Sequence, residues 1–371
     1  MATSEPVAKR QRRAAPTGGE EVLRTRRPRA LDADLIRYFR QLEVTLVSFK
    51  EEAAAGGGND HSEMLVAAAL REMKNSEASA ASHKHCSHVV EKLLSIASGL
   101  ALRQFMHNAA GFALHMCTNR YASHVVQVML KRASKLLFAP EAASSEVEDE
   151  DAPPPMAELI ASFCGELEQD WAIVIQDPSG SHAARTLLEL LRGDGGRDGS
   201  AAAAVSSIVT PLPSPAAEML GGIVPSICDN LLQLGWSTLR KVASTHHSGG
   251  TLTLLVEALA AHQRQLRLLR INLLSDSRQT PSEALVKLTS YASGSRVVES
   301  LVRVSSGKGG CDGEVILHFF CLLARYSLFA HSILLSTALN YFVSSLNSWP
   351  SAKRSARSRS PRTATTSRRR S

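Results

Sequence analysis

A short unit of sequence recurs along this chain, and the recurrence limits the folds that the chain can adopt. Residues 119–127 read NRYASHVVQ: a turn-like start, a small residue, a polar pair, two β-branched apolar residues and an amide. A helix that begins near Ala122 would place four apolar side chains on one face by their i, i+3, i+4 spacing: Val125, Val126, Met129 and Leu130. The polar side chains would gather on another face: Ser123, His124 and Gln127.

The same arrangement returns at three other places: residues 85–91 (HCSHVVE), 179–185 (SGSHAAR) and 293–299 (SGSRVVE). Less complete copies lie at residues 338–344 (ALNYFVS), 61–65 (HSEML) and 248–254 (SGGTLTL). One unit repeated every few tens of residues is typical of a solenoid, in which each repeat buries its apolar face against its neighbours. We therefore expect an all-α solenoid (superhelix) of about seven repeats.

Composition agrees with a helical fold. Hydrophobic residues make up 44% of the chain and aromatic residues only 5%, and the abundance of Ala and Leu favours helices over sheets. No apolar run approaches the roughly 18 residues that span a bilayer, and the charged N-terminus does not resemble a secretory signal. The cysteines form no CxxC pair, so we expect reduced core thiols: Cys86, Cys117, Cys164, Cys228, Cys311 and Cys321.

The array is predicted over residues 31–347, with inserted loops near 139–155, which is acidic, and 193–215, which is rich in Gly, Ala, Ser and Pro. Its first helices are expected at residues 31–50, 62–73 and 86–97, and then from near Leu100. Apolar side chains form a stripe on the opening helix: Leu35, Tyr38, Phe39, Leu42, Leu46 and Phe49.

Both ends of the chain are basic, although the net charge is only +7. Residues 1–30 are predicted to be a disordered tail, with basic clusters typical of a nuclear import signal: Lys9, Arg10, Arg12 and Arg13. A generic solvated tail and a direct contact with RNA phosphates are alternatives. Residues 348–371 are predicted to be a disordered Arg/Ser-rich tail, and read-through beyond the real domain is its alternative.

At the helix starts the repeated unit resembles the pumilio (Puf) repeat, and the resemblance covers about residues 31–347. The layout is most similar to divergent members of that family that act in assembly of the small ribosomal subunit. Three features carry this likeness: the opening helix around residues 35–39, the degenerate copy at 61–65 and the basic N-terminus. Those proteins have more repeats, so we expect the chain to be an N-terminal portion, a shortened variant or an incomplete gene model.

The resemblance implies that each repeat reads about one base of single-stranded RNA with two or three side chains of one helix. A flat side chain stacks on the base, and polar side chains on either side contact its edge. Ser123 and Gln127 would be edge readers around the stacking His124, a set that favours adenine in the family.

Three further sets follow from the same resemblance. Two favour guanine, because a carboxylate accepts from guanine N–H groups: Ser87, His88 and Glu91, and Ser295, Arg296 and Glu299, the latter with Arg296 as the stacking plane. The third places a guanidinium on an acceptor-rich edge such as that of cytosine: Ser181, His182 and Arg185. In the last copy Asn340 and Tyr341 match, whereas Ser344 is too short to read much. The copies at Gly250 and Ser62 lack a stacking or edge-reading side chain.

Other chemistry is weakly supported. Residues 83–88 (HKHCSH) suggest a metal site, but zinc takes four ligands from paired loops and no second cluster lies nearby in the sequence. No nucleotide-binding, zinc-protease or nucleophile-elbow motif occurs. Ser181 and His182 are adjacent on one helix, where they cannot easily form a catalytic pair with a third orienting group. We therefore expect no enzyme, no cofactor and no metal.

The resemblance implies a non-catalytic RNA-binding protein of the nucleus and nucleolus. It would recognise precursor ribosomal RNA, single-stranded or structured, during small-subunit biogenesis, with pre-ribosomal assembly proteins as further candidate partners. Membrane and small-molecule partners are not expected. Two other roles stay open: a pumilio-type regulator of messenger RNA translation or decay, against which the basic N-terminus argues, and a helical-repeat scaffold that binds proteins.

Overall fold

The computed structural model describes five stretches of the chain: residues 27–54, 60–138, 152–193, 214–274 and 281–305. They belong to one compact unit, Met1–Val304, apart from Ser305, and the second unit, Ser305–Ser371, otherwise lies outside the described residues. Residues 1–26 of the predicted N-terminal tail, the predicted C-terminal tail, most of the two inserted loops, and Asn340 and Tyr341 also lie outside the described residues.

A group of three helices is the structural unit of the described part. The first group consists of a short helix, a longer second helix and a third helix: α4 (Glu77–Ser82), α5 (Cys86–Ile96) and α6 (Gly99–Asn108). The next two groups follow the same order: α7 (Ala113–Thr118), α8 (Ala122–Leu137) and α9 (Met156–Glu166), then α10 (Trp171–Gln176), α11 (Pro178–Leu191) and α13 (Ile223–Leu232), the last preceded by α12 (Ser214–Leu220).

The fourth group ends with a 3₁₀ turn and a helix: α14 (Gly235–Ser244), α15 (His246–Ala258), η4 (Leu259–Ala261) and α16 (Gln263–Leu274). The fifth is described only in part: α17 (Pro281–Thr289) and α18 (Ala292–Ser305). Two helices precede the groups and both pack on α5: α2 (Ala33–Ala54) and α3 (Asp60–Glu72).

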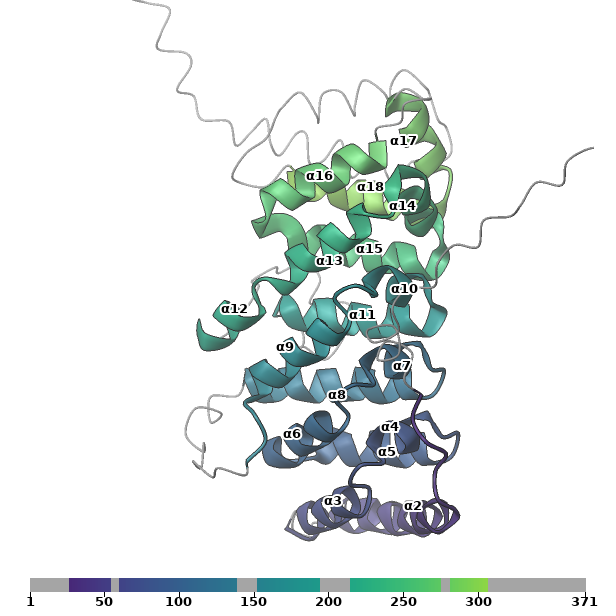
Figure 1. Cartoon of the computed structure of the whole chain (residues 1–371), viewed down its shortest axis with the longest axis vertical. Coiled ribbons are helices and arrows are strands. Elements are labelled where there is room, and N and C mark those ends of the chain that lie inside the picture. The colour runs from purple at the N-terminus through teal and green to yellow at the C-terminus, as the bar shows by residue number, and fades with distance from the viewer. Residues whose placement is uncertain (1–26, 55–59, 139–151, 194–213, 275–280, 306–371) are drawn as a thin grey trace, which may run out of the picture. The chain divides into compact units, whose positions relative to one another are not determined.

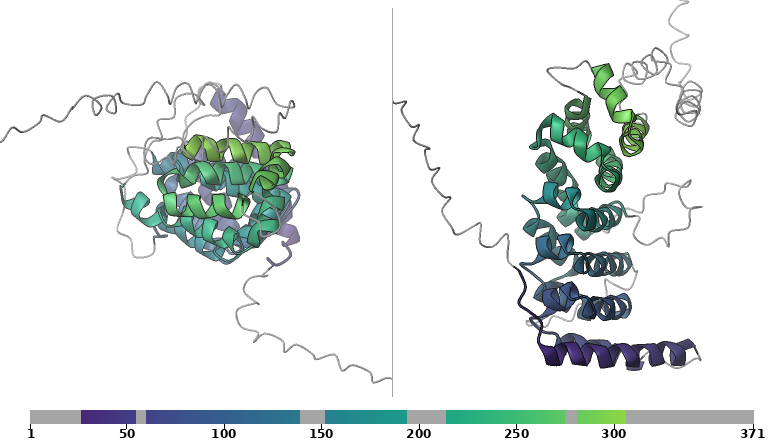
Figure 2. Two further views of the ribbon diagram at one scale, coloured as in Figure 1. Left: turned by 90° about the horizontal axis from the view of Figure 1, so that it is seen from above. Right: turned by 90° about the vertical axis from the view of Figure 1, so that its right-hand side faces the viewer.

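The groups stack into an all-α solenoid, as predicted. The second helices lie side by side in chain order, α5 on α8, α8 on α11 and α11 on α15 (Figure 1). Ser300 and Arg303 of α18 continue this order because both bind Glu257 of α15. Figure 2 shows the same stacking from the side, with α2 and α3 beneath α5.

The predicted helix starts are confirmed where the structure describes them, whereas of the stripe predicted on the opening helix only Phe39 and Leu42 are buried among the side chains described. The helix expected to begin near Ala122 does so, and all four side chains of its apolar stripe are buried: Val125, Val126, Met129 and Leu130. The helices expected at 31–50, 62–73 and 86–97 match α2, α3 and α5 to within a few residues. The weak copy at 61–65 falls on α3, outside the three-helix groups.

In two groups, a side chain of the third helix accepts hydrogen bonds from backbone N–H groups at the start of the first helix. Glu166, the last residue of α9, accepts hydrogen bonds from the N–H groups of Gly111 and Ala113 at 2.7 and 3.0 Å. In the next group, Asn230 of α13 accepts a hydrogen bond from the N–H of Ala172 at 3.1 Å. Such contacts satisfy N–H groups that a helix start leaves unpaired, and they fix how each group folds back on itself.

Four cysteines are free and buried, as predicted for core thiols: Cys86, Cys117, Cys164 and Cys228. Burial raises the pKa of Cys86 to about 11 and that of Cys228 to about 12. Cys311 and Cys321 lie outside the described residues. Within the described ranges, no helix combines the length and the apolar character that a bilayer crossing requires.

Candidate nucleic-acid interface

The starts of α8 and α11 are each fixed by a side chain at the same position of the repeat. Asn119 Oδ1 accepts hydrogen bonds from the N–H groups of Tyr121 and Ala122 at 2.9 and 3.0 Å. Asp177 Oδ1 does the same for Ser179 and Gly180, at 2.8 Å each. Because these caps define where the helix begins, they also set the direction of the polar pair that follows.

A row of exposed imidazoles follows these helix starts. His88, His124 and His182 occupy the same repeat position on α5, α8 and α11, and all three are exposed; we call them the histidine row. The pKa of His182 is lowered by partial burial and by the positive charges of Arg185, His124 and His247. Because α5 packs on α8 and α8 on α11, the row continues from one repeat to the next.

The serines expected to contact base edges lie beneath the histidine row. Ser87, Ser123 and Ser181 are at most 2% exposed. Ser181 donates its hydroxyl hydrogen to the carbonyl of Pro178 at 2.9 Å, and Ser87 and Ser123 make the equivalent bonds at 3.5 Å. Base contact by these serines stays a prediction: each hydroxyl oxygen can still accept a hydrogen bond, but its burial keeps it from a base in this structure.

The third residue of each predicted set is half-buried, and its partner differs between repeats. Gln127 donates from Nε2 to the carbonyl of Ser123 at 3.1 Å. Glu91 Oε1 lies 3.8 Å from Nδ1 of His88, and Glu299 accepts a hydrogen bond from Arg303 at 3.1 Å. These side chains stay near the surface beside the stacking position, where a base edge could reach them. Arg296 of α18 is exposed, and Ser295 beside it is half-buried.

Arg185 extends from α11 to the next repeat. Its Nη2 donates to the carbonyl of His247 at 2.6 Å, and its Nε donates to Thr251 Oγ1 at 3.4 Å. Its expected contact with a base edge stays a prediction, but the guanidinium lies over α15 in this structure. Sequence reasoning missed this bridge, although Gly250, at a position where four other copies carry serine, was a signal of the space that Arg185 fills.

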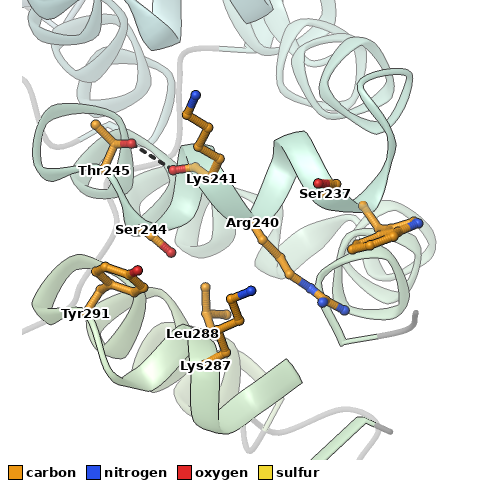
Figure 3. A pocket seen from close by; sticks show the side chains of 9 residues that line it. Ser237, Arg240, Lys241, Ser244, Thr245, Lys287, Leu288 and Tyr291 are labelled. Carbon is orange, nitrogen blue, oxygen red and sulfur yellow. Dashed lines mark hydrogen bonds between the residues drawn. The ribbon is translucent and has the colours of Figure 1, made fainter. Parts of the chain in front are cut away.

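A second feature that sequence reasoning missed is a basic cavity between α14 and α17 (Figure 3). Its volume is about 430 Å³, and its lining is polar and basic with no acidic side chain: Trp236, Ser237, Arg240, Lys241, Ser244, Thr245, Lys287, Leu288 and Tyr291. Arg240 lies with its guanidinium carbon 5.0 Å from the centre of the Trp236 ring and donates from Nε to the carbonyl of Leu273. The cavity adds positive charge close to the start of α18.

The histidine-rich segment 83–88 is explained by helix capping and packing. His83 Nδ1 accepts hydrogen bonds from the N–H groups of His85 and Cys86, at 3.4 Å each, and so caps α5. Cys86 is buried, whereas His88 belongs to the histidine row. Among the described residues, no group of three or more His, Cys, Asp or Glu side chains is placed to hold a metal ion.

Comparison with known proteins agrees with this geometry. The family described as "NOP9-like PUF repeat domain" matches residues 75–210. Nucleolar protein 9 of Coccidioides posadasii is 28% identical over 187 residues, which cover 48% of this chain and 25% of that protein. Nucleolar protein 9 of Arthroderma benhamiae is 24% identical over 329 residues, which cover 75% of this chain and 44% of that protein. The chain therefore spans less than half the length of these curated relatives.

A solved structure of APUM23 with GGAAUUGACGG has a similar fold. Its TM-score is 0.57 at 19% identity, over 74% of this chain and 49% of that chain. A second APUM23 structure, with GGAUUUGACGG, has a TM-score of 0.57 at 20% identity over the same shares. The repeated unit, the stacked three-helix groups and these matches show an α-solenoid of pumilio-like repeats that is similar to nucleolar protein 9.

Proposed function

We propose that this chain binds single-stranded segments of precursor ribosomal RNA in the nucleolus, during assembly of the small ribosomal subunit. The observation that carries the proposal is the histidine row: three exposed imidazoles at one repeat position on three helices that pack in succession. Flat side chains spaced one per repeat suit splayed bases, each of which stacks on one ring. Stacking of this kind contributes about 1–3 kcal/mol per base.

Basic side chains beside the histidine row support nucleic acid as the ligand. Lys84 and Arg120 are exposed and lie four residues before His88 and His124. Each can approach the phosphates of a strand whose bases stack on the row, and such contacts add affinity that falls with salt. The relatives' name, Nucleolar protein 9, supports the nucleolar location.

The proposed role is non-catalytic. A strand held with its bases on the row stays unpaired and is covered along one side, so binding would delay folding of that segment or shield a processing site from a nuclease. Pre-ribosomal assembly proteins are further proposed partners, because an RNA held on one face leaves the remaining helices of each group accessible.

A titration with a fluorescent RNA tests this proposal. Replacing His88, His124 and His182 together by Ala should weaken binding of the 11-nucleotide RNA GGAAUUGACGG, or of the tightest binder from a random pool, by about fivefold or more per stacked base. His107→Ala is the matched control, because His107 is also exposed but lies on α6, away from the row. Equal affinity of the triple variant and the control for every RNA would contradict base stacking.

Crosslinking in cells followed by RNA sequencing tests the kind of RNA. Precursor ribosomal RNA should dominate the crosslinked reads. Enrichment of messenger RNA untranslated regions would indicate a regulator of translation or decay instead, and an absence of RNA crosslinks alongside stable protein partners would indicate a scaffold.

A further inference from the structure

We call the junction between two successive second helices a step of the solenoid. The step between α11 and α15 differs from the earlier steps at one residue position. In α5, α8 and α11 the small residue at the helix start is followed by Ser87, Ser123 or Ser181, whereas α15 has Gly250 at that place. A Cβ atom built on Gly250 would lie 3.2 Å from Cζ of Arg185 and 3.3 Å from its Nε. The missing side chain therefore makes the room that the guanidinium occupies.

Several polar bonds hold Arg185 in that place. Its Nη2 binds the carbonyl of His247, and its Nε binds Thr251 Oγ1. Thr251 in turn donates its hydroxyl hydrogen to the carbonyl of Ser181 on α11 at 3.1 Å. His247 Nε2 lies 3.0 Å from the carbonyl oxygen of Gln176, which is a further link across the same step.

The consequence is that α15 offers no stacking surface. The position that carries His124 in α8 and His182 in α11 carries Thr251 in α15, and Thr251 is 0% exposed. At the next step Arg296 of α18 is exposed again at the same position. A strand that follows the histidine row thus meets a closed step at α15 before it reaches another exposed flat side chain.

We propose that the Arg185 side chain, here called the plug, blocks access of bases to the surface between α11 and α15. The RNA is then recognised as two short sequence blocks separated by nucleotides that the protein does not read. This inference rests on the proposed function, because it specifies which bases the same face can contact. In this inference Arg185 contributes to specificity by excluding bases. Its N–H groups bind protein carbonyl and hydroxyl oxygens, and a base at this step would have to break those hydrogen bonds.

Selection from a random RNA pool tests the proposal and does not require a known ligand sequence. The full chain is mixed with single-stranded RNA of 14 random nucleotides, and the bound fraction is sequenced. The native chain should enrich two blocks of constrained positions with at least one unconstrained position between them. The variant Arg185→Gln with Gly250→Ser and Thr251→His rebuilds the Ser-His pair of α8 on α15, and it should constrain one further position inside the gap.

Two single variants accompany this test. Arg185→Gln alone opens the step without adding bulk to α15. It should therefore reduce the number of unconstrained positions between the two blocks, even if the triple variant fails to fold. Arg132→Gln is the matched control, because Arg132 also bridges two repeats, with Nε 2.9 Å from the carbonyl of Ala97, but lies on α8 beyond the row. The control should keep the two blocks and their spacing.

The outcomes separate the plug from RNA binding itself. One unbroken block for the native chain, or a gap that persists in Arg185→Gln, overturns the plug and leaves RNA binding in place. An unbroken block in which Arg185→Gln changes the preferred base at a single position assigns Arg185 to edge reading instead. If the native chain enriches no RNA, both the plug and the proposed function fail.

Discussion

Glu257 of α15 and Arg192 at the end of α11 form an ion pair between successive repeats, with side chains 18% and 22% exposed. The same carboxylate accepts hydrogen bonds from Ser300 and Arg303 of α18, at 3.1 and 3.0 Å. One side chain thus connects three consecutive second helices. Charge-assisted hydrogen bonds between partly buried groups are stronger than those exposed to water. Glu257 therefore contributes to the stability of the stacked repeats.

Replacing Glu257 by Gln should lower the free energy of unfolding by about 2 kcal/mol, because the two guanidinium groups lose a shared partner while staying partly buried. Urea unfolding followed by circular dichroism measures the change. Asp34→Asn is the control: it breaks the ion pair between Arg37 and Asp34 on α2, whose side chains are 74% and 82% exposed, and exposed pairs add little to stability. Equal losses in both variants would contradict the linking role of Glu257.

Gly180 lies where α11 passes against the backbone of α10, and we expect Gly180→Ala to destabilise the fold. A Cβ atom there would overlap the carbonyl oxygen of Val174, a backbone atom that cannot move aside cheaply. The expected loss is about 1–3 kcal/mol. Gly165 of α9 is the control, since a Cβ atom there meets nothing within 4 Å; Gly165→Ala should raise the melting temperature because Ala is the better helix former. Changes of the same sign would contradict the packing assigned to Gly180.

Local sequence pattern predicted the helices and the repeat positions of the candidate interface. The apolar pairs such as Val125 and Val126 mark the buried face because helical spacing depends only on near neighbours in the chain. The exposed position of the histidine row follows from the same spacing. These features recur in each copy, so each copy supports the others.

Features that depend on contacts between distant residues could not be predicted in this way. Arg185 meets its partners on α15, and no local pattern tells whether so long a side chain turns to solvent or to a neighbouring repeat. Burial of Ser87, Ser123 and Ser181 was also missed, since a hydroxyl that binds its own helix looks in sequence like one that faces a ligand. The basic cavity between α14 and α17 requires the packing of two helices from different repeats.

Glu77 should make stability depend on pH. Its side chain is 2% exposed, and although Oε1 accepts a hydrogen bond from Asn108 at 2.7 Å, Oε2 has no hydrogen-bond partner among the described residues. Burial raises the pKa of this carboxyl group above its ordinary value. A raised pKa in the folded state means that the folded chain takes up the proton more readily than the unfolded chain.

The sign of the effect follows from this uptake. As the pH rises through the raised pKa of Glu77, the free energy of unfolding of the native chain falls because this carboxyl group loses its proton. Glu77→Gln cannot titrate at this position, so it lacks this loss of stability. The difference in stability between the native chain and Glu77→Gln should therefore shift in favour of the native chain when the pH falls from 8 to 4. Urea unfolding of both chains at several pH values measures it, and parallel profiles would contradict the raised pKa of Glu77.

The positive charge of Arg185 should also affect the pKa of His182. Burial lowers the pKa of His182, and the charge of Arg185 lowers it further, because a positive neighbour disfavours the imidazolium form. Arg185→Gln should therefore raise the pKa of His182, measured by NMR with labelled histidine in the RNA-free chain, whereas Arg132→Gln should leave it unchanged. If the pKa of His182 is the same in both variants, the guanidinium does not lie beside this ring in solution.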